Sequence, residues 1–441
     1  MKKLLLVTTA LVGVAMMSAP ANAAVKLGLG GYFSTYGMHT DSDTTDERNM
    51  DWRRDSELFF TGATTLDNGL TVGINYELDL GSTTTGAAEN FLTDEAYMYF
   101  SGGWGRLNIG SEDGSAFLLQ VTAPSADANI DGMQVTMQGI ASQDLSNDTG
   151  LTGLFDMTTN GLGLKQSNLL DYQHVSSATG LNNLDRLTYL TPKFNGFQAG
   201  VSYAPQNVQG GGTSSVAAMG TDNNNGTYDD IWEGSVRWDG EFQGFGIALG
   251  GGYSNASLQE DSAADVLTAV AGDEDDAPVV TDDLTTWNVG ANFAWSGFSL
   301  GGSYSRQNTE AASVVETAVA GVYELASLDV DQTTWVVGLG YDNGPWHLGA
   351  SYLDLDIERD GHGTAAVNDG ESAAIDAEAH KYTVGAGYTF GPGMTFNGSI
   401  AWGEFDNSTG ASDVDQLGDF AAVAADQNDF TQVTVGTNIQ F

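Results

Sequence analysis

The sequence contains no cysteine, and basic residues, proline and long apolar runs are also scarce. The absence of cysteine excludes thiol catalysis, a disulfide framework and cysteine-ligated zinc. Only 14 Lys and Arg stand against 58 Asp and Glu, which gives a formal charge of -44. Such a charge repels nucleic acid phosphates, so we expect no nucleic acid partner. The chain is nevertheless 41% hydrophobic and 10% aromatic, which is too apolar for a disordered protein.

Residues 1–23 have the pattern of a secretory signal peptide. Two lysines lie near the start, a mainly apolar run covers 4–17, and the small residues Ala21 and Ala23 mark a cleavage site after Ala23. The alternative, a membrane anchor, is disfavoured because this run is shorter than the roughly 20 residues that span a bilayer. No later run approaches 18 apolar residues, so the sequence predicts no membrane-spanning helix in 24–441.

The body of the chain alternates apolar and polar residues with a period of two. In 70–80 every second residue is Leu, Val, Ile or Tyr, and the residues between are Thr, Gly, Asn, Glu or Asp. The same alternation recurs in 334–341, in 381–390 and in 432–441. It is typical of strands with one face in an apolar medium and the other in water. Their length suits tilted membrane strands of about 9 to 11 residues better than the shorter strands of a soluble sandwich.

Connections between these strands alternate in length. Short ones such as 67–69 and 193–196 alternate with long ones such as 205–230 and 255–284, and together seven short and eight long connections join sixteen strands. An even number of strands, with tight turns on one side and long loops on the other, is the layout of an outer-membrane barrel. The sequence therefore predicts a sixteen-stranded antiparallel transmembrane β-barrel over residues 24–441.

Tryptophans lie near the ends of two predicted strands. Trp287 and Trp295 bracket one strand, and Trp232 and Trp238 lie six positions apart on another. Membrane barrels carry aromatic girdles at both bilayer interfaces. We expect these rings to belong to two such girdles, although each alone is also compatible with a core tryptophan.

Four patches carry a resemblance to the general porins of Gram-negative bacteria, especially the alphaproteobacterial branch. They are the turn and strand 101–110, the strand–turn–strand 184–197, the hairpin 385–393 and the last strand, which ends in Phe441. The resemblance implies short periplasmic turns, long extracellular loops and a third loop, 112–184, that folds inward. It also implies a homotrimer that passes small hydrophilic solutes and ions by diffusion. The C-terminal Phe441 resembles the signal that barrel-assembly machinery recognises.

In such a pore, loop carboxylates face a basic wall and narrow the lumen. The predicted carboxylates are Glu112, Asp113, Asp127 and Asp131, and the predicted basic residues are Arg53, Arg54, Arg106 and Arg237. Strand parity points all of these arginines inward except Arg54, which lies near a loop end. Because acids crowd the loops, and charged rings select ions of opposite sign, we expect a channel that leans toward cations.

A row of acids near the end of one strand is a weak candidate for a cation site. Asp354, Asp356, Glu358 and Asp360 share one parity, and oxygen ligands suit Ca²⁺ or Mg²⁺. A solvated acidic face is the favoured alternative. Their parity is that of lipid-facing residues, so they lie either above the bilayer or beyond a bulge. At the outer leaflet, divalent ions would bridge them to lipopolysaccharide. No other cofactor is expected.

No catalytic constellation stands out, so we expect no enzyme. The five histidines are scattered, and with 58 carboxylates any acid pair carries no information. The alternative to an outer-membrane porin is an exported β-rich adhesin or surface structural protein without channel activity. That reading requires neither lipid-facing aromatic girdles nor a terminal Phe441. Release from membranes by carbonate without detergent would favour it.

Overall fold

The computed structural model describes most of the predicted strands and the start of the third loop. The described residues are 25–42, 50–80, 92–127, 184–206, 228–258, 279–280, 283–316, 323–363, 375–409 and 426–441. The predicted signal peptide, residues 1–23, lies outside them.

Nearly all of the described elements are strands, and one is a short helix, α1 (Ser115–Leu118). The strands are β1 (Lys26–Ser42), β2 (Met50–Thr65), β3 (Thr71–Asp79), β4 (Leu92–Gly102), β5 (Gly105–Glu112), β6 (Leu184–Leu190), β7 (Phe197–Gln206), β8 (Tyr228–Phe242), β9 (Phe245–Leu258), β10 (Val279–Val280), β11 (Leu284–Trp295), β12 (Phe298–Glu316), β13 (Tyr323–Asn343), β14 (Trp346–Gly363), β15 (Ile375–Gly391), β16 (Met394–Thr409) and β17 (Asp426–Gln440). Helical segments able to span a bilayer are absent from the described residues.

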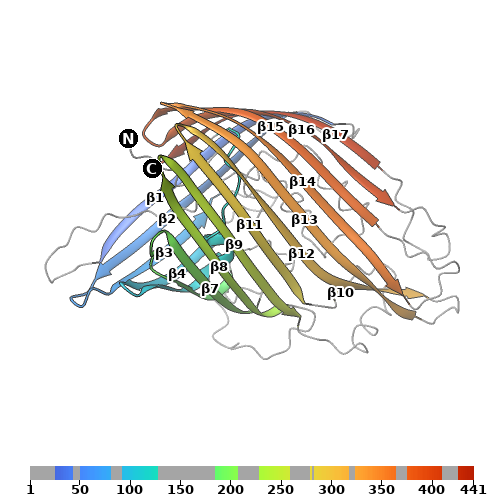
Figure 1. The fold of residues 1–441 in the computed structure, drawn as a ribbon, viewed down its shortest axis with the longest axis horizontal. Helices are drawn as coiled ribbons and strands as arrows, with labels where there is room; N and C mark the ends of the chain where they lie inside the picture. The colour runs from blue at the N-terminus through green and yellow to red at the C-terminus, as the bar shows by residue number, and fades with distance from the viewer. Residues whose placement is uncertain are drawn as a thin grey trace.

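The strands form one antiparallel ring (Figure 1). Apart from the short β10, each strand pairs with the next along the chain, β9 with β11, and β1 also pairs with β17, which closes the barrel. The two-residue strand β10 pairs only with the end of β12, so sixteen of the seventeen strands make up the ring. The predicted sixteen-stranded barrel is confirmed.

Short turns join the strands at one end of the barrel because their residues accept positive φ. Asn195 and Gly196 have φ of 50° and 85°, and Ser296 and Gly297 have φ of 51° and 90°. Two consecutive positive φ values are the mark of the hairpin turns whose twist matches that of paired strands. The short connections therefore lie where the sequence predicts them.

The period of two separates the two faces of the barrel wall. On β17, Val433 and Val435 face outward and are exposed, whereas Gln432 and Thr434 face inward and are buried. A wall with apolar residues outside and polar residues inside is what a bilayer around a water-filled interior requires.

Aromatic rings form two rows on the outer face. The row beside the short turns, called the turn-side row, contains Trp104–Tyr189, Phe197–Trp238, Phe245–Trp295, Phe298–Tyr341 and Trp346–Tyr388. The row nearer the long loops, called the loop-side row, contains Tyr203–Trp232, Trp287–Tyr304, Trp335–Tyr352 and Tyr382–Trp402. Each predicted tryptophan pair contributes one ring to each row, as two interfacial girdles require.

Candidate functional site

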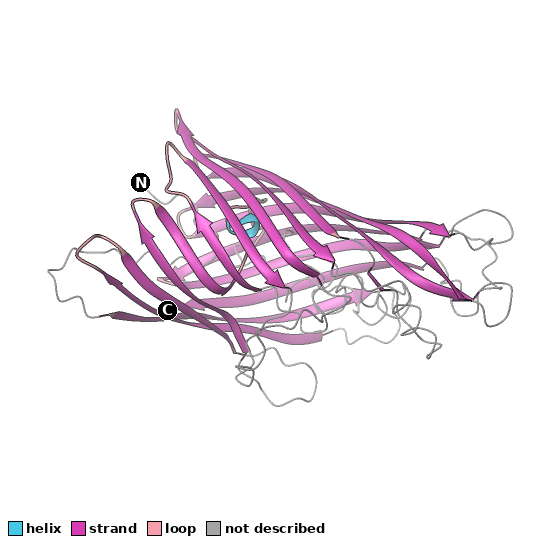
Figure 2. Ribbon diagram, turned by 90° about the horizontal axis from the view of Figure 1, so that it is seen from below, coloured by secondary structure: helices cyan, strands magenta, loops and turns pink. Residues whose placement is uncertain are grey.

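The chain leaves β5 and enters the barrel as a strap, defined here as residues 114–127. It begins with α1, and Figure 2 shows this helix enclosed by the ring of strands. Contacts of α1 with β6, β7, β8 and β9 place it against the inner wall. Residues 114–127 therefore fold inward, as predicted for the third loop, and the rest of 112–184 up to the start of β6 lies outside the described residues.

A buried ion pair holds the start of the strap. The Glu233 carboxylate accepts a hydrogen bond from the Ala116 backbone N–H at 3.1 Å and pairs with the Arg186 guanidinium at 2.5 Å. Ser202 accepts from the Ser115 N–H at 2.8 Å, and Ser235 donates to the Ser115 carbonyl at 2.7 Å. The backbone of α1 is thus bound by side chains from the wall.

Wall side chains also bind the carbonyl groups farther along the strap. Arg237 donates to the Gln120 carbonyl at 3.0 Å, and Asn292 donates to the Thr122 carbonyl at 3.3 Å. His347 Nε2 lies 2.9 Å from the Ser125 carbonyl oxygen. Buried backbone polar groups need such partners. Arg237, predicted as an inward-facing residue of the basic wall, therefore also holds the strap.

The far end of the described strap reaches β15. Asp127 is buried there and lies within electrostatic range of the buried Lys381. Asp127, a predicted constriction carboxylate, is thus placed inside the barrel beside a basic group. Asp131 lies outside the described residues.

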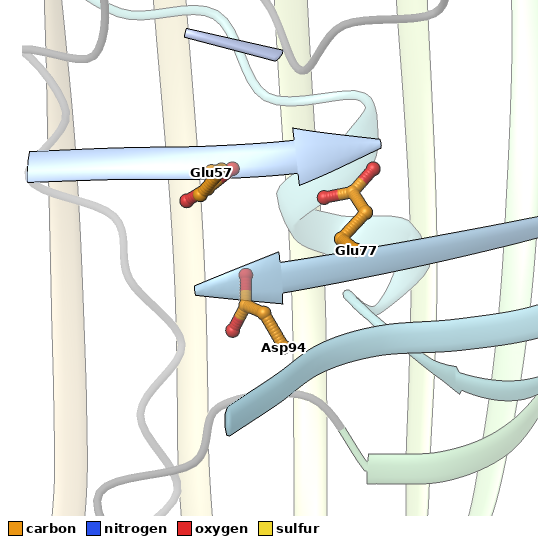
Figure 3. Close-up of side chains that lie close together, drawn as sticks. All are labelled: Glu57, Glu77 and Asp94. Carbon is orange, nitrogen blue, oxygen red and sulfur yellow. The ribbon is translucent and has the colours of Figure 1, made fainter. Parts of the chain in front are cut away.

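Three carboxylates gather on the inner wall at β2, β3 and β4. Glu57, Glu77 and Asp94 each have an oxygen within 4.8 Å of the others, and Figure 3 shows their side chains pointing toward one another. Tyr32 donates to Glu57 at 3.0 Å, and Asn75 donates to Glu77 at 2.7 Å. This acidic triad is the set of described acids close enough together to hold a hard cation such as Ca²⁺ or Mg²⁺.

A β-bulge creates the triad. Tyr76 pairs with Ala96 but Leu78 pairs with Thr93, so Glu77 faces two residues of β4, Asp94 and Glu95. A bulge re-aims side chains in this way. By simple alternation from Met98, Asp94 would face lipid, so the sequence pattern alone could not find it.

The root of the strap extends the acidic wall. Glu95 is buried, accepts from the Asp113 N–H at 3.3 Å, and lies within electrostatic range of Glu77 and Glu112. Glu112 is buried and accepts from Asn108 at 2.7 Å. The structure therefore brings the predicted Glu112 and Asp113 beside acids that the prediction omitted.

The arginines predicted to form a basic wall lie in different environments and do not form one cluster in the described residues. The Arg106 guanidinium lies 4.0 Å from the centre of the Tyr99 ring and donates to Asn108 at 2.7 Å. Arg54 is exposed near the start of β2, and the side chain of Arg53 lies outside the described residues. Arg106 is within electrostatic range of Glu112, and so is Arg186, which the prediction omitted.

The weak cation candidates lie outside the barrel, beyond the loop-side row. Asp354 is 2.8 Å from His380 Nδ1 and accepts from the Tyr352 hydroxyl at 2.9 Å. Asp356 is half-buried and Glu358 exposed, whereas the side chain of Asp360 lies outside the described residues. Alternate residues of a strand are about 6.6 Å apart, which separates these carboxylates more than those of the triad.

The sequence matches the Gram-negative porin family over residues 8–408. No curated protein matches the chain. The match covers most of the chain and agrees with the inward strap and the barrel.

Solved structures of porins share the fold. An anion-selective porin from Comamonas acidovorans has a TM-score of 0.55 at 16% identity, with 95% of this chain and all of that chain covered. The trimer form of OmpT from Vibrio cholerae has a TM-score of 0.53 at 12% identity, with the same coverage. OmpF from Salmonella typhi, in complex with daunomycin, has a TM-score of 0.51 at 17% identity, with 94% and 97% covered.

These findings decide between the two readings left open by the sequence. The family consists of channel proteins of the outer membrane, so the prediction that the chain is no enzyme is confirmed, and the adhesin alternative is disfavoured. The inward strap, the closed barrel and the family match agree that the chain belongs to the Gram-negative porin family, as an outer-membrane diffusion channel.

Proposed function

We propose that the channel passes small hydrophilic solutes and ions with a preference for cations. The observation that carries this proposal is the acidic triad, Glu57, Glu77 and Asp94, on the inner wall. The strands of the triad, β2 to β4, differ from the strands β6 to β9 that hold α1. Carboxylates on the wall of a water-filled passage lower the barrier for cations and raise it for anions.

The state of the basic residues supports the same proposal. Arg186 and Arg237 are engaged with Glu233 and with the strap, and Arg106 lies over an aromatic ring. Glu233 compensates the charge of Arg186, and Asp239, 3.0 Å from Arg237, compensates the charge of Arg237. The fold itself is compatible with either sign of selectivity, since a neighbour of similar fold is described as anion-selective.

Reversal potentials in a planar bilayer under a KCl gradient test the proposal. We expect the wild type to prefer K⁺, and the variant Glu57→Gln/Glu77→Gln/Asp94→Asn to have a severalfold lower cation-to-anion permeability ratio. One carboxylate about 4 Å from a cation stabilises it by about 1 kcal/mol in water. The variant Asp354→Asn/Asp356→Asn/Glu358→Gln, which also removes three carboxylate charges but from the outer face, is the matched control. An anion preference of the wild type, or an unchanged ratio in the triad variant, would refute the proposal.

We further propose that the channel is a homotrimer in contact with outer-membrane lipid and lipopolysaccharide. A trimer form of a protein with the same fold supports the first part. The outward-facing acids beyond the loop-side row, among them Asp354, Asp356 and Glu358, support the second, because lipid headgroups lie beyond an interfacial aromatic girdle. Recognition of Phe441 by barrel-assembly machinery stays a prediction.

A further inference from the structure

We propose that five glycines on the inner wall set the size of the pore, because they let the strap lie directly on the wall. These glycines, called the glycine track, are Gly250, Gly290, Gly338, Gly349 and Gly385. They come from five strands, β9, β11, β13, β14 and β15, and each lies under the strap. The proposal rests on the channel function of the family and names the residues that determine its size selectivity.

The strap touches each glycine so closely that no side chain fits. A Cβ atom added at Gly250 would lie 3.0 Å from the Leu119 carbonyl oxygen, and one at Gly338 would lie 2.9 Å from the Pro124 carbonyl oxygen. At Gly349 it would lie 2.7 Å from the Ala126 carbonyl oxygen. Ordinary contacts of Cβ atoms begin near 3.4 Å, so the strap backbone could not stay where it is.

The remaining two positions are at least as tight. An added Cβ at Gly385 would lie 2.5 Å from Asp127 Cβ, and at Gly290 it would overlap the Val121 carbonyl oxygen. Backbone atoms of the strap lie beside the track at all five positions, so a change of rotamer cannot relieve the clash.

The track follows the sheet register. Gly250 pairs directly with Gly290, and Gly349 pairs directly with Gly385. Arg237, which binds the Gln120 carbonyl, is the register partner of Gly250 on the other side. Glycines and hydrogen-bonding side chains thus lie along the same path across the strands, the first giving room to the strap and the second binding it.

The backbone conformation does not require glycine at these positions. None of the five has a positive φ, in contrast to the turn glycines such as Gly196 and Gly297. Glycine also weakens a strand, because it loses more conformational freedom on folding and has no side chain to pack. The close approach of the strap is the feature that accounts for a track of glycines here.

An added side chain would move the strap rather than the wall. The wall is a closed barrel in which every strand is hydrogen-bonded on both sides, whereas the strap is bound at separate points. The strap therefore moves away from the wall and into the lumen, which narrows the passage. Pore diameter governs the passage of hydrophilic solutes.

Single-channel conductance and exclusion of neutral polymers of increasing size test the proposal. We expect Gly290→Ala and Gly349→Ala each to lower conductance by roughly a factor of two and to shift the polymer cut-off to smaller sizes. Gly234→Ala is the matched control, because Gly234 lies on the outer face of β8 with nothing within 4 Å of an added Cβ. An unchanged cut-off in both track variants would overturn the proposal, as would an equal shift in the control.

If Gly290→Ala and Gly349→Ala do not fold, a second pair of variants tests whether the glycine track sets the pore size. An added Cβ at Gly250 would lie 2.9 Å from Val121 Cγ2, so Gly250→Ala should narrow the pore and Gly250→Ala/Val121→Ala should partly restore it. Wild-type conductance in Gly250→Ala would refute the proposal, and so would the absence of any restoration. A wild type that forms no channel would instead contradict the family function, so the two failures are distinguishable.

Discussion

Glu233 shows how one buried residue supports both the wall and the strap. Its carboxylate binds Arg186 and the start of α1, and the two side chains are only 1% and 2% exposed. A buried charge is tolerated when it is paired and hydrogen-bonded, and it becomes unfavourable once its partner is removed. Glu233 therefore stabilises the folded state only together with its partner Arg186.

We expect Glu233→Ala to lower the free energy of unfolding by about 3–5 kcal/mol, because it leaves the buried Arg186 charge unpaired. Urea titrations of the barrel in lipid vesicles would measure this. The double variant Glu233→Ala/Arg186→Met should be closer to the wild type, since it removes both charges.

The exposed pair Arg306–Asp331 is the matched control. Its side chains are 48% and 25% exposed. An exposed ion pair contributes about 1 kcal/mol or less. An effect of Asp331→Ala as large as that of Glu233→Ala would contradict this account of burial.

At the scale of the element, strand pairing determines two features: the direction of the Asp94 side chain and the closure of the barrel. The bulge in β4 turns Asp94 inward, and the pairing of β1 with β17 closes the ring. The closing seam ends at Phe441, whose backbone exchanges two hydrogen bonds of 3.0 Å with Gly31. The Phe441 side chain is exposed.

Deletion of Phe441 should impair both the seam and assembly. Two backbone hydrogen bonds contribute about 1–3 kcal/mol together. Phe441→Ala keeps these bonds and removes only the ring, so we expect normal refolding in detergent but less protein in the outer membrane. Refolding yield and the outer-membrane fraction would be measured for both variants. Equal amounts of Phe441→Ala and wild type in the outer membrane would contradict the role of the ring in assembly.

At the scale of the whole molecule, the placement of charge matters more than its sum. The formal charge is -44, yet within the membrane span the outer face carries aromatic and aliphatic side chains between its two aromatic rows. The acids described above lie on the inner wall or beyond the loop-side row. A membrane protein can therefore be acidic and lack any long apolar run.

The proposed homotrimer predicts a specific pattern of channel closure. We expect one inserted particle to close in three equal conductance steps in a planar bilayer. Light scattering in mild detergent should give three times the mass of the mature chain. Closure in a single step, together with the mass of one chain, would contradict the trimer.

The sequence by itself determined the barrel, its sixteen strands, the tight turns and the two aromatic rows. These features follow from local patterns, since a period of two needs one apolar face and turn residues accept positive φ wherever they occur. The resemblance also predicted 112–184 as the inward loop, and in the described part of this range Glu112, Asp113 and Asp127 lie inside the barrel.

Only the tertiary structure determined which side chains meet inside the barrel. The bulge that brings Asp94 to Glu57 and Glu77 depends on the register between strands, which alternation cannot reveal. The engagement of Arg237 and the role of the glycine track depend on where the strap lands. A pattern along one strand says which face a residue occupies, whereas its partners come from distant segments that meet only in the folded barrel.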